Sequence, residues 1–411
     1  MTDAPRCRFC GTPLTQSFVD LGAMPFANSY LTSKQLQLPE PRYPLHARVC
    51  GDCRLVQVEA MAAPAELFGH YAYFSSFSST WVEHARRFAE MARTRWSLGT
   101  ASKVVEVASN DGYLLKHFVA AGVPVLGVEP AANVAETAIK SGIPTDVSFF
   151  GRATADRLRR EGHAADLIVG NNVLAHVPDI NDFVAGLAIL LKAEGVVSLE
   201  FPHLLRLIEN VQFDTIYHEH FSYLSLLASE RILGAHGLRI FDIEELPTHG
   251  GSLRLMACHA GAGHAEGAAL AKVRADEAAA RLERDEGYAG FEPRVRAVRE
   301  GLLAFLGDAR GRGQTVAAYG AAAKGNTLLN YCGVDAKLID YVVDRSPHKQ
   351  GLFMPGSHLP ILAPDRLAQT RPDFVLILPW NLQDEIVNDM ADIRDWGGRF
   401  VVAVPRLTVL N

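Results

Sequence analysis

Apolar and polar residues follow two different periods along this chain. From Trp81 to Trp96, apolar side chains recur at the spacing of an amphipathic helix. After this segment, short apolar runs of strand length are separated by segments with a helical period. We expect strands at 104–108, 125–129, 166–170 and 195–200, and helices at 113–121 and 183–193. Strands that alternate with helices in this way predict a doubly wound parallel sheet.

The same alternation returns in the C-terminal third. Strands are expected at 316–319, 338–343 and 374–378, with a helix that begins near Lys324, and the Ala-, Glu- and Arg-rich stretch 266–312 is expected to be helical. The first 75 residues are rich in proline and turn residues and have no long helical period. The chain therefore predicts an α/β protein with a small N-terminal module (1–75), a central Rossmann-like domain (76–260) and a C-terminal Rossmann-like α/β domain (261–411).

Composition and charge exclude some classes of function. The chain has 411 residues, of which 48% are hydrophobic and 21% charged, so it can bury large cores. The net charge of −6 argues against a nucleic-acid-binding protein, which needs a surplus of basic residues. The first residues do not form a signal peptide, and the apolar runs are too short to span a bilayer. We expect a cytoplasmic protein that binds no nucleic acid and no membrane, as a monomer or weak homo-oligomer.

Four of the six cysteines form two pairs with the spacing of zinc ligands. Cys7 and Cys10 make one C-x-x-C pair, and Cys50 and Cys53 make the other. Each pair can place two thiolates on one metal ion, and two pairs complete a tetrahedral shell. Redox dithiols or disulfides are the alternative, but a reducing compartment favours zinc. Because four thiolates leave no position for water, we expect a structural Zn²⁺ and no chemistry at the metal.

Acidic and polar side chains follow the first two strands of the central sheet. The first strand contains Glu106 and runs into Asn110, Asp111 and Gly112, and Glu129 ends the second strand. Ligands of such sheets bind at the carboxyl ends of the strands, and a carboxylate at the second end can accept hydrogen bonds from both hydroxyls of a ribose. The turn lacks a G-x-G-x-x-G series, which weakens the case for a dinucleotide. A pyrophosphate needs the closest backbone approach, whereas a sulfonium amino acid does not.

The third strand of the central sheet ends in polar residues as well. It runs into Asn171, Asn172 and, shortly after, His176. Side chains here can contact the methionyl part of a sulfonium cofactor or its transferred methyl group. Helix caps or ordinary loop residues are the alternative, but the position at a third carboxyl end favours a role in binding.

One short segment concentrates groups suited to proton transfer. Tyr217, His218, Glu219, His220 and Tyr223 lie within a few positions of one another. Methylation of a carbon next to a ketone needs a base for the acidic α-proton and donors for the enolate oxygen. Histidine suits the first task and tyrosine the second. A structural hydrogen-bond cluster and a second metal site are the alternatives, although the H-E-x-x-H pattern of zinc proteases is absent.

The C-terminal domain has its own candidate site, for an anion. Its first strand leads into a run of small residues before Lys324, where backbone amides at the start of a helix can approach a phosphate and the lysine supplies a cation. The G-K-[ST] of a P-loop is absent, so a tight α/β turn without a ligand is the alternative. The candidate substrate-binding residues here and in the glycine turn at 249–251 are Tyr319, Lys324, Asn326, Asp344, Lys349 and His249.

Taken in order, these segments resemble the sugar C-methyltransferase family that makes the branched deoxysugars of antibiotics. The resemblance covers nearly the whole chain. It begins at the paired cysteines and continues through SSFSSTW, VEVASNDGYLL, NNVLAHVPDINDF, EFPHLLRLIENVQFDTIYHEHFSYLS, THGGSLR, AYGAAAKGNTLLNY and DRSPHKQG. It implies a zinc module, a central domain that binds S-adenosylmethionine (SAM) and a C-terminal domain that binds a nucleotide-linked keto-sugar.

The resemblance also implies a mechanism and roles for single residues. A base removes the proton next to a C4 ketone, usually at C3, and the enolate attacks the methyl group of SAM. Carried over, His220 is the base, Tyr217 and Glu219 support the enolate and the base, and Tyr73 lies near the transferred methyl. Lys324 and Asn326 fall at the turn that binds the pyrophosphate.

Two other functions remain open from the sequence. A nucleotide-sugar oxidoreductase or epimerase would also use α/β domains, and a zinc-dependent scaffold would retain an inert α/β core.

Overall fold

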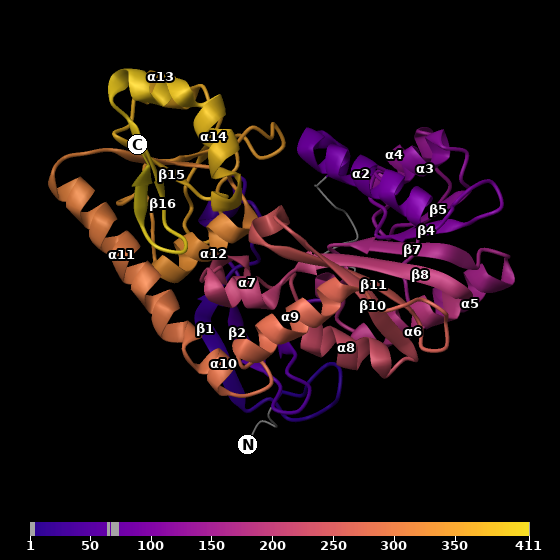
Figure 1. Ribbon diagram of the computed structural model, residues 1–411. Helices are drawn as coiled ribbons and strands as arrows, with labels where there is room; N and C mark the ends of the chain where they lie inside the picture. Colours follow the sequence, from indigo (N-terminus) through magenta and orange to yellow (C-terminus); the bar gives the residue numbers. More distant parts are fainter. Residues whose placement is uncertain (1–4, 64–65, 67–73, 411) are drawn as a thin grey trace.

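The computed structural model describes residues 5–63, 66 and 74–410. In this part of the chain the strands form three sheets (Figure 1). The N-terminal sheet has the order β1 (Gln16–Met24), β2 (Tyr43–Val49), β3 (Val56–Gln57) and β9 (Ser222–Tyr223), and all its pairs are antiparallel. Strand β9 comes from the segment with the tyrosine and histidine cluster. The N-terminal module is therefore closed by a strand from the middle of the chain.

The central sheet has seven strands in the described residues. Their order is β10 (Leu238–Leu246), β11 (Ser252–His259), β8 (Leu191–Pro202), β7 (Ala165–Asn171), β4 (Val104–Val107), β5 (Val125–Val128) and β6 (Thr145–Asp146). Strands β4 to β8 are parallel, as predicted, but β11 runs antiparallel to both of its neighbours. The sequence analysis did not predict strands β10 and β11, which follow each other as a hairpin through a short turn and add an antiparallel edge to the predicted parallel strands.

Helices cover both faces of the central sheet. One face packs against α2 (Ser79–Arg95), α3 (Leu115–Ala120) and α4 (Ala132–Lys140). The other face packs against α5 (Arg152–Arg160), α6 (Ile180–Leu190), α8 (Leu226–Gly234) and α9 (Ala268–Ala279). A short helix, α7 (Leu204–Glu209), follows β8. The two layers of helices confirm the doubly wound arrangement (Figure 1).

The predicted amphipathic helix is α2. Ser78 caps it by accepting a hydrogen bond from the Trp81 backbone amide, at 3.3 Å. Its buried residues are Ala85, Phe88, Ala89 and Ala92, which lie on the predicted apolar face.

The C-terminal sheet repeats the parallel arrangement. Its order is β14 (Ile361–Leu362), β13 (Val342–Val343), β12 (Val316–Tyr319), β15 (Phe374–Ile377), β16 (Arg399–Val402) and β17 (Thr408–Leu410), and of the described strands β17 alone is antiparallel to its neighbour. The helices of this part are α10 (Glu286–Ala289), α11 (Phe291–Gly311), α12 (Ala323–Cys332), α13 (Arg366–Thr370) and α14 (Gln383–Asp389).

The stretch 266–312 is helical, as predicted, but it is broken. Helix α9 ends where Arg281 adopts a φ of 58° and the Leu282 amide bonds back to the Glu277 carbonyl at 3.1 Å. Leu282 is fully buried, so its side chain fixes this end. As a result, α9 packs on the central sheet, whereas α11 packs on the C-terminal sheet (Figure 1).

The N-terminal module contributes to two separate cores. Its cysteine region, with Leu14 and Leu55, packs in the core of the central sheet. Strands β1 and β2 instead pack in a core that includes α11, α12 and one face of the C-terminal sheet. The module therefore joins the other two parts of the molecule, although the domain limits at 75 and 260 remain predictions.

Candidate active site and zinc site

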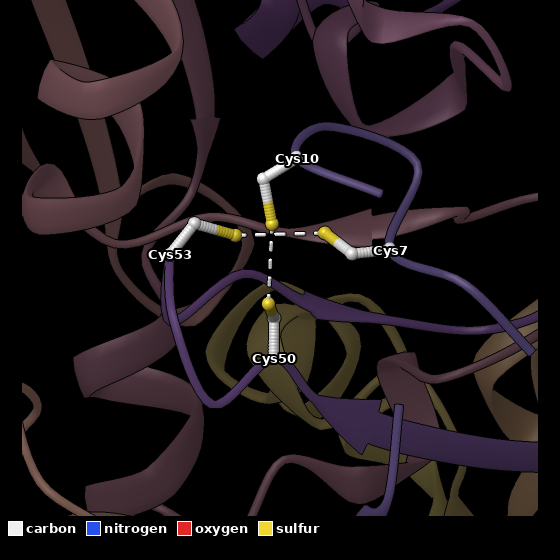
Figure 2. Close-up of side chains that lie close together, drawn as sticks. All are labelled: Cys7, Cys10, Cys50 and Cys53. Carbon is white, nitrogen blue, oxygen red and sulfur yellow. Dashed lines mark hydrogen bonds between the residues drawn. The ribbon is translucent and has the colours of Figure 1, made fainter. Parts of the chain in front are cut away.

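The four paired cysteines lie together at one point of the N-terminal module (Figure 2). Their sulfur atoms are within 4.8 Å of one another, with Cys7 Sγ 3.5 Å from Cys53 Sγ and Cys10 Sγ 3.4 Å from Cys50 Sγ. All four are free thiols. These separations are close to the ~3.8 Å that a tetrahedral zinc–thiolate shell requires. Gln57 Nε2 donates to Cys7 Sγ at 3.1 Å and orients that ligand.

The turn after β4 has an unusual backbone. Ala108, Asn110 and Gly112 have φ values of 56°, 51° and 79°. A Cβ at Gly112 would lie 2.2 Å from Ile143 Cδ1, so this position requires glycine. Positive φ at residues other than glycine is costly and clusters at ligand sites. The turn is therefore shaped for a ligand at the carboxyl end of β4.

Three predicted cofactor-binding acids are buried around this turn. Glu106, Asp111 and Glu129 are 1%, 6% and 5% exposed. Glu129 accepts hydrogen bonds from the backbone amides of Asn110 at 3.0 Å and Ala131 at 2.9 Å. Both oxygens of Glu106 and Asp111 Oδ1 lack a hydrogen bond among the described residues. Burial raises the pKa of Glu106 well above its ordinary value and also raises the pKa of Glu129.

These acids fit a ligand that brings positive charge and hydroxyl donors. Buried polar atoms without partners are rare in folded proteins, so they indicate a missing polar partner. SAM has an ammonium group, a sulfonium and a ribose with two free hydroxyls. Its charge and donors match this set of acceptors.

The residues after β7 extend the same edge. Asn171 Nδ2 donates to the Tyr113 hydroxyl at 3.3 Å, and Asn171 Oδ1 has no hydrogen bond within the described part of the chain. Asn172 adopts a φ of 53° and its side chain lies 3.3 Å from His249 Nε2. His176 Nδ1 donates to the Glu219 carbonyl at 2.8 Å. The polar ends of β4, β5 and β7 thus form one surface that reaches the tyrosine and histidine segment.

The serine-rich turn before α2 is attached to this surface. Asn110 Oδ1 accepts a hydrogen bond from the Ser75 amide at 2.9 Å, and Asp111 Oδ2 accepts from the Ser76 hydroxyl at 2.5 Å. Tyr73, the predicted neighbour of the transferred methyl, lies outside the described residues.

Both ring nitrogens of His220 have hydrogen-bond partners. Its Nδ1 donates to the Thr215 carbonyl at 2.9 Å, which leaves Nε2 as the acceptor for the Tyr217 hydroxyl at 2.6 Å. Burial, followed by the nearby His176, lowers the pKa of His220 well below its ordinary value. The ring centroids of His176 and His220 are 4.6 Å apart. Both Tyr217 and His220 keep partial contact with solvent, so a ligand can reach them.

Glu219 and His218 point away from His220, toward the N-terminal module. Glu219 Oε2 accepts from Asn28 Nδ2 at 2.5 Å, and burial raises the pKa of this carboxyl to about 7. His218 Nε2 lies 3.2 Å from the Tyr43 and Pro44 carbonyls. The structure therefore places the Glu219 side chain beside Asn28. The backbone carbonyl of Glu219, and not its carboxyl, accepts the hydrogen bond from His176.

The carboxyl edge of the C-terminal sheet contains cations. Lys324 Nζ donates to Asn381 Oδ1 at 2.7 Å and lies 4.5 Å from the centre of the Trp380 ring. Lys349 Nζ donates to the Ala321 carbonyl at 2.7 Å and lies 3.8 Å from Asp344 Oδ2. Burial lowers the pKa of both lysines. Two partly buried ammonium groups near the start of α12 are suited to an anionic ligand.

Three other predicted substrate residues have different surroundings. Asn326 is 1% exposed, and its Nδ2 donates to the Ala27 carbonyl of the N-terminal module. Tyr319 ends β12 and is 5% exposed. His249 is exposed, has a φ of 55°, and stands between Asn172 and the Trp81 ring, 5.7 Å away. The structure brings His249 to the polar ends of the central strands, beside Asn172, and it buries Asn326 against the N-terminal module.

The sequence analysis missed three residues that hold the site. Asn28 binds Glu219, Trp380 Nε1 donates to Asp214 Oδ2 at 2.7 Å, and Asp214 is fully buried. Asp214 stands in the string that carries the family resemblance, but neither Asn28 nor Trp380 stands in a recognisable motif. Only long-range contacts show their positions.

Family models match the chain in three consecutive parts. A zinc binding domain family matches residues 7–68, a methyltransferase domain family matches 81–243, and a C-methyltransferase C-terminal domain family matches 247–405. The C-methyltransferase NovU of Streptomyces niveus is 35% identical over 405 residues, which cover 98% of this chain and 96% of NovU. This chain belongs to that C-methyltransferase family.

Other similar proteins cover less of the chain. A ubiquinone biosynthesis O-methyltransferase of Bartonella quintana is 32% identical over 96 residues, which cover 23% of this chain and 39% of that protein. The solved structure of magnesium protoporphyrin IX methyltransferase from Synechocystis PCC 6803 covers 43% of this chain and 83% of its own, with 16% identity and a TM-score of 0.35.

Membership of the family confirms several predictions. The protein is a SAM-dependent C-methyltransferase with a zinc-binding module, a Rossmann-like methyltransferase domain and a C-terminal α/β domain. The oxidoreductase and inert-scaffold alternatives are excluded. None of the helices in the described residues is long and apolar enough to cross a membrane.

Proposed function

We propose that this C-methyltransferase acts on a nucleotide-linked 4-keto-deoxysugar, at the carbon next to the ketone and most simply at C3. The observation that carries the proposal is the placement of the His220 ring. Its tautomer is fixed by the Thr215 carbonyl, and its ring lies beside His176, which follows strand β7 of the cofactor edge. A base in this position can remove a proton from a carbon that faces the methyl group of SAM.

The hydrogen bonds of His220 suggest a separate role for each of its ring nitrogens. Nδ1 keeps its proton, which is hydrogen-bonded to the Thr215 carbonyl, so Nε2 is the nitrogen that accepts the α-proton of the sugar. The electron pair of the broken C–H bond stays on the sugar, which becomes the enolate. When bound at the acidic edge, SAM would supply an electrophilic methyl carbon to the enolate and would depart as S-adenosylhomocysteine. The Tyr217 hydroxyl is hydrogen-bonded to Nε2 in this structure, and with substrate bound it would donate instead to the developing enolate oxygen.

The cation-lined edge of the C-terminal sheet supports a nucleotide diphosphate as the remote part of the substrate. Lys324 and Lys349 would bind its charge, and Tyr319 and Asp344 stand at the ends of the strands beside them. Binding of the diphosphate fixes the sugar in place, so that the carbanion and the methyl group of SAM are already positioned next to each other. Such positioning is worth roughly 7–11 kcal/mol at best.

The test uses methyl-labelled SAM and a panel of dTDP-, GDP- and CDP-linked 4-keto-deoxysugars. We expect one panel member to gain a labelled methyl group on the carbon next to the ketone, located by NMR. A label on a hydroxyl oxygen, or transfer to none of the keto-sugars, would contradict the proposal.

The base is tested by His220→Asn, with His236→Asn as the matched control. His236 lies at the end of α8, where its Nε2 pairs with Asn181. We expect His220→Asn to lower kcat by a factor of about 10² to 10⁴ while zinc content and SAM affinity are retained. The control should keep its turnover. Full turnover in His220→Asn would move the base to another residue.

A further inference from the structure

Trp380 lies between segments that carry candidate residues of both edges. It follows β15 in a short turn, Trp380–Leu382. Its Nε1 donates to Asp214 Oδ2 at 2.7 Å, and the face of its ring lies 4.5 Å from Lys324 Nζ. The ring also packs closely on the turn that carries His249. A Cβ on Gly250 would lie 2.4 Å from Trp380 Cη2. One side chain thus touches three segments that are distant in sequence.

Asp214 is the partner that leads to the base. It is fully buried, and its Oδ1 has no hydrogen bond within the residues that the structure describes. Among the described side chains, Trp380 is the one for which the structure shows a hydrogen bond to this carboxyl, at Oδ2. Asp214 belongs to the short turn Phe213–Thr215, and the carbonyl of Thr215 accepts the Nδ1 proton of His220. The position of this turn decides which nitrogen of His220 is free to act.

Lys324 is the partner that leads to the substrate. Its ammonium group is held between the Asn381 oxygen and the Trp380 ring, both from the same turn. A cation over an aromatic face is attracted to the ring, and the attraction grows when water is excluded. An anion that binds Lys324 would therefore meet an ammonium group whose position is already fixed by the Trp380 ring.

We propose, on the basis of the proposed function, that Trp380 is a positioning residue that couples diphosphate binding at Lys324 to the placement of His220. The ring fixes the lysine, and the indole N–H fixes the Asp214–Thr215 turn. Binding the nucleotide at the C-terminal sheet and orienting the base beside the methyl donor then depend on one rigid side chain. Trp380 itself takes no part in proton or methyl transfer.

The test separates the two functions of the side chain. Trp380→Phe keeps an aromatic face for Lys324 but removes the hydrogen bond to Asp214. We expect kcat to fall by a factor of about 10 to 100, because small displacements of a base have effects of this size. The dissociation constants of thymidine, guanosine and cytidine diphosphate, measured by calorimetry, should stay within about twofold, since the cation–π contact remains. Trp380→Leu removes both contacts and should lower kcat and weaken the diphosphate as well.

Trp396→Phe is the matched control. Trp396 lies in the same part of the chain, and its Nε1 donates to the Pro372 carbonyl at 3.1 Å. It should lose a similar indole hydrogen bond without any change in kcat. The inference is overturned if Trp380→Phe has wild-type kcat, or if its kcat and diphosphate affinity fall by the same factor as the folded fraction.

A second readout needs no turnover, so it distinguishes this inference from the proposed function. Nitrogen-15 NMR of the histidine rings in the full chain, assigned with His220→Asn, reports the tautomer of His220. We expect the Nδ1–H form in the wild type and a mixture of tautomers in Trp380→Phe. An unchanged tautomer would overturn the inference even if no keto-sugar is methylated. A wild type that methylates nothing, with the tautomer change present, would instead overturn only the proposed function.

Discussion

The two parallel sheets of this protein have the same local arrangement at their carboxyl edges but opposite charge. In the central sheet, Glu129 follows the second strand and accepts the backbone amide of Asn110 in the turn after the first. In the C-terminal sheet, Asp344 stands in the corresponding place and accepts the backbone amide of Ala321, at 2.8 Å. In both sheets an acid after the second strand fixes the turn that follows the first.

The neighbours of these two acids differ. The central edge adds Glu106 and Asp111, each with carboxylate oxygens that find no hydrogen-bond partner in the described part of the chain, whereas the C-terminal edge adds Lys324 and Lys349. The same fold therefore carries hydrogen-bond acceptors at the edge of one sheet and cations at the edge of the other, which under the proposed function suit a cationic cofactor and an anionic ligand. A shared fold does not determine the ligand, because a few side chains at the strand ends decide its charge.

The largest effect is expected from the acidic edge. Glu129→Ala removes a buried carboxylate that the proposed function places at SAM, and charged hydrogen bonds contribute about 1.5–3 kcal/mol each. We expect the SAM dissociation constant to rise by about 100-fold in calorimetry, while the nucleoside diphosphate constants remain unchanged. Glu136→Ala, at an exposed position of α4, is the matched control. If Glu129→Ala weakened SAM and the nucleoside diphosphates by the same factor, the two edges would not bind different ligands.

The opposite result is expected from the cationic edge. Lys324→Ala should weaken nucleoside diphosphates by about 10- to 30-fold and leave SAM affinity within twofold, because one charge-assisted contact is lost. Lys337→Ala, an exposed lysine of the same part, is the control. Because burial lowers the pKa of Lys324, diphosphate affinity should also decline with rising pH earlier than an ordinary lysine would allow. A diphosphate constant that Lys324→Ala leaves unchanged would place the anion elsewhere.

Removal of zinc should have a smaller effect that is unequal at the two edges. The N-terminal module reaches the C-terminal edge through the Tyr30 hydroxyl, which donates to the Ala321 carbonyl at 2.6 Å, and through the Ala27 carbonyl, which binds Asn326. We expect chelation to lower the melting temperature by about 10 °C and to weaken diphosphates several-fold more than SAM. Restoring zinc should reverse both changes. A melting temperature insensitive to the chelator would show that the cysteine cluster holds no structural metal.

The smallest effect is expected at Glu219, which lies against Asn28 of the N-terminal module. Burial raises the pKa of Glu219 to about 7, so the folded chain keeps a proton that the unfolded chain releases at lower pH. Stability should therefore decline as pH rises from about 4.5 to about 7. Glu219→Gln removes this decline, so its melting temperature relative to wild type should be higher at about pH 8 than at about pH 5. A difference that does not depend on pH would show that Glu219 is ionised in the folded state.

Much of this arrangement could be predicted from the sequence because it is local. Two C-x-x-C pairs, the alternation of strands and helices, and Glu129 at a strand end are patterns within short segments. The pairing of β9 with β3, the antiparallel β11 and the break before Leu282 depend on contacts between distant segments. The direction of the Glu219 side chain could not be predicted either, because it is set by Asn28, which belongs to another part of the chain.

The most direct test of the account is hydrogen exchange without methyl transfer. The protein is incubated in D₂O with S-adenosylhomocysteine and the keto-sugar that it methylates, so that an enolate can form but has no methyl group to attack. We predict that deuterium enters the carbon next to the ketone well above the rate without enzyme, and that His220→Asn abolishes this excess while His236→Asn does not. Exchange that proceeds equally in His220→Asn would contradict the account, because the carbanion would then form without the base on which it rests.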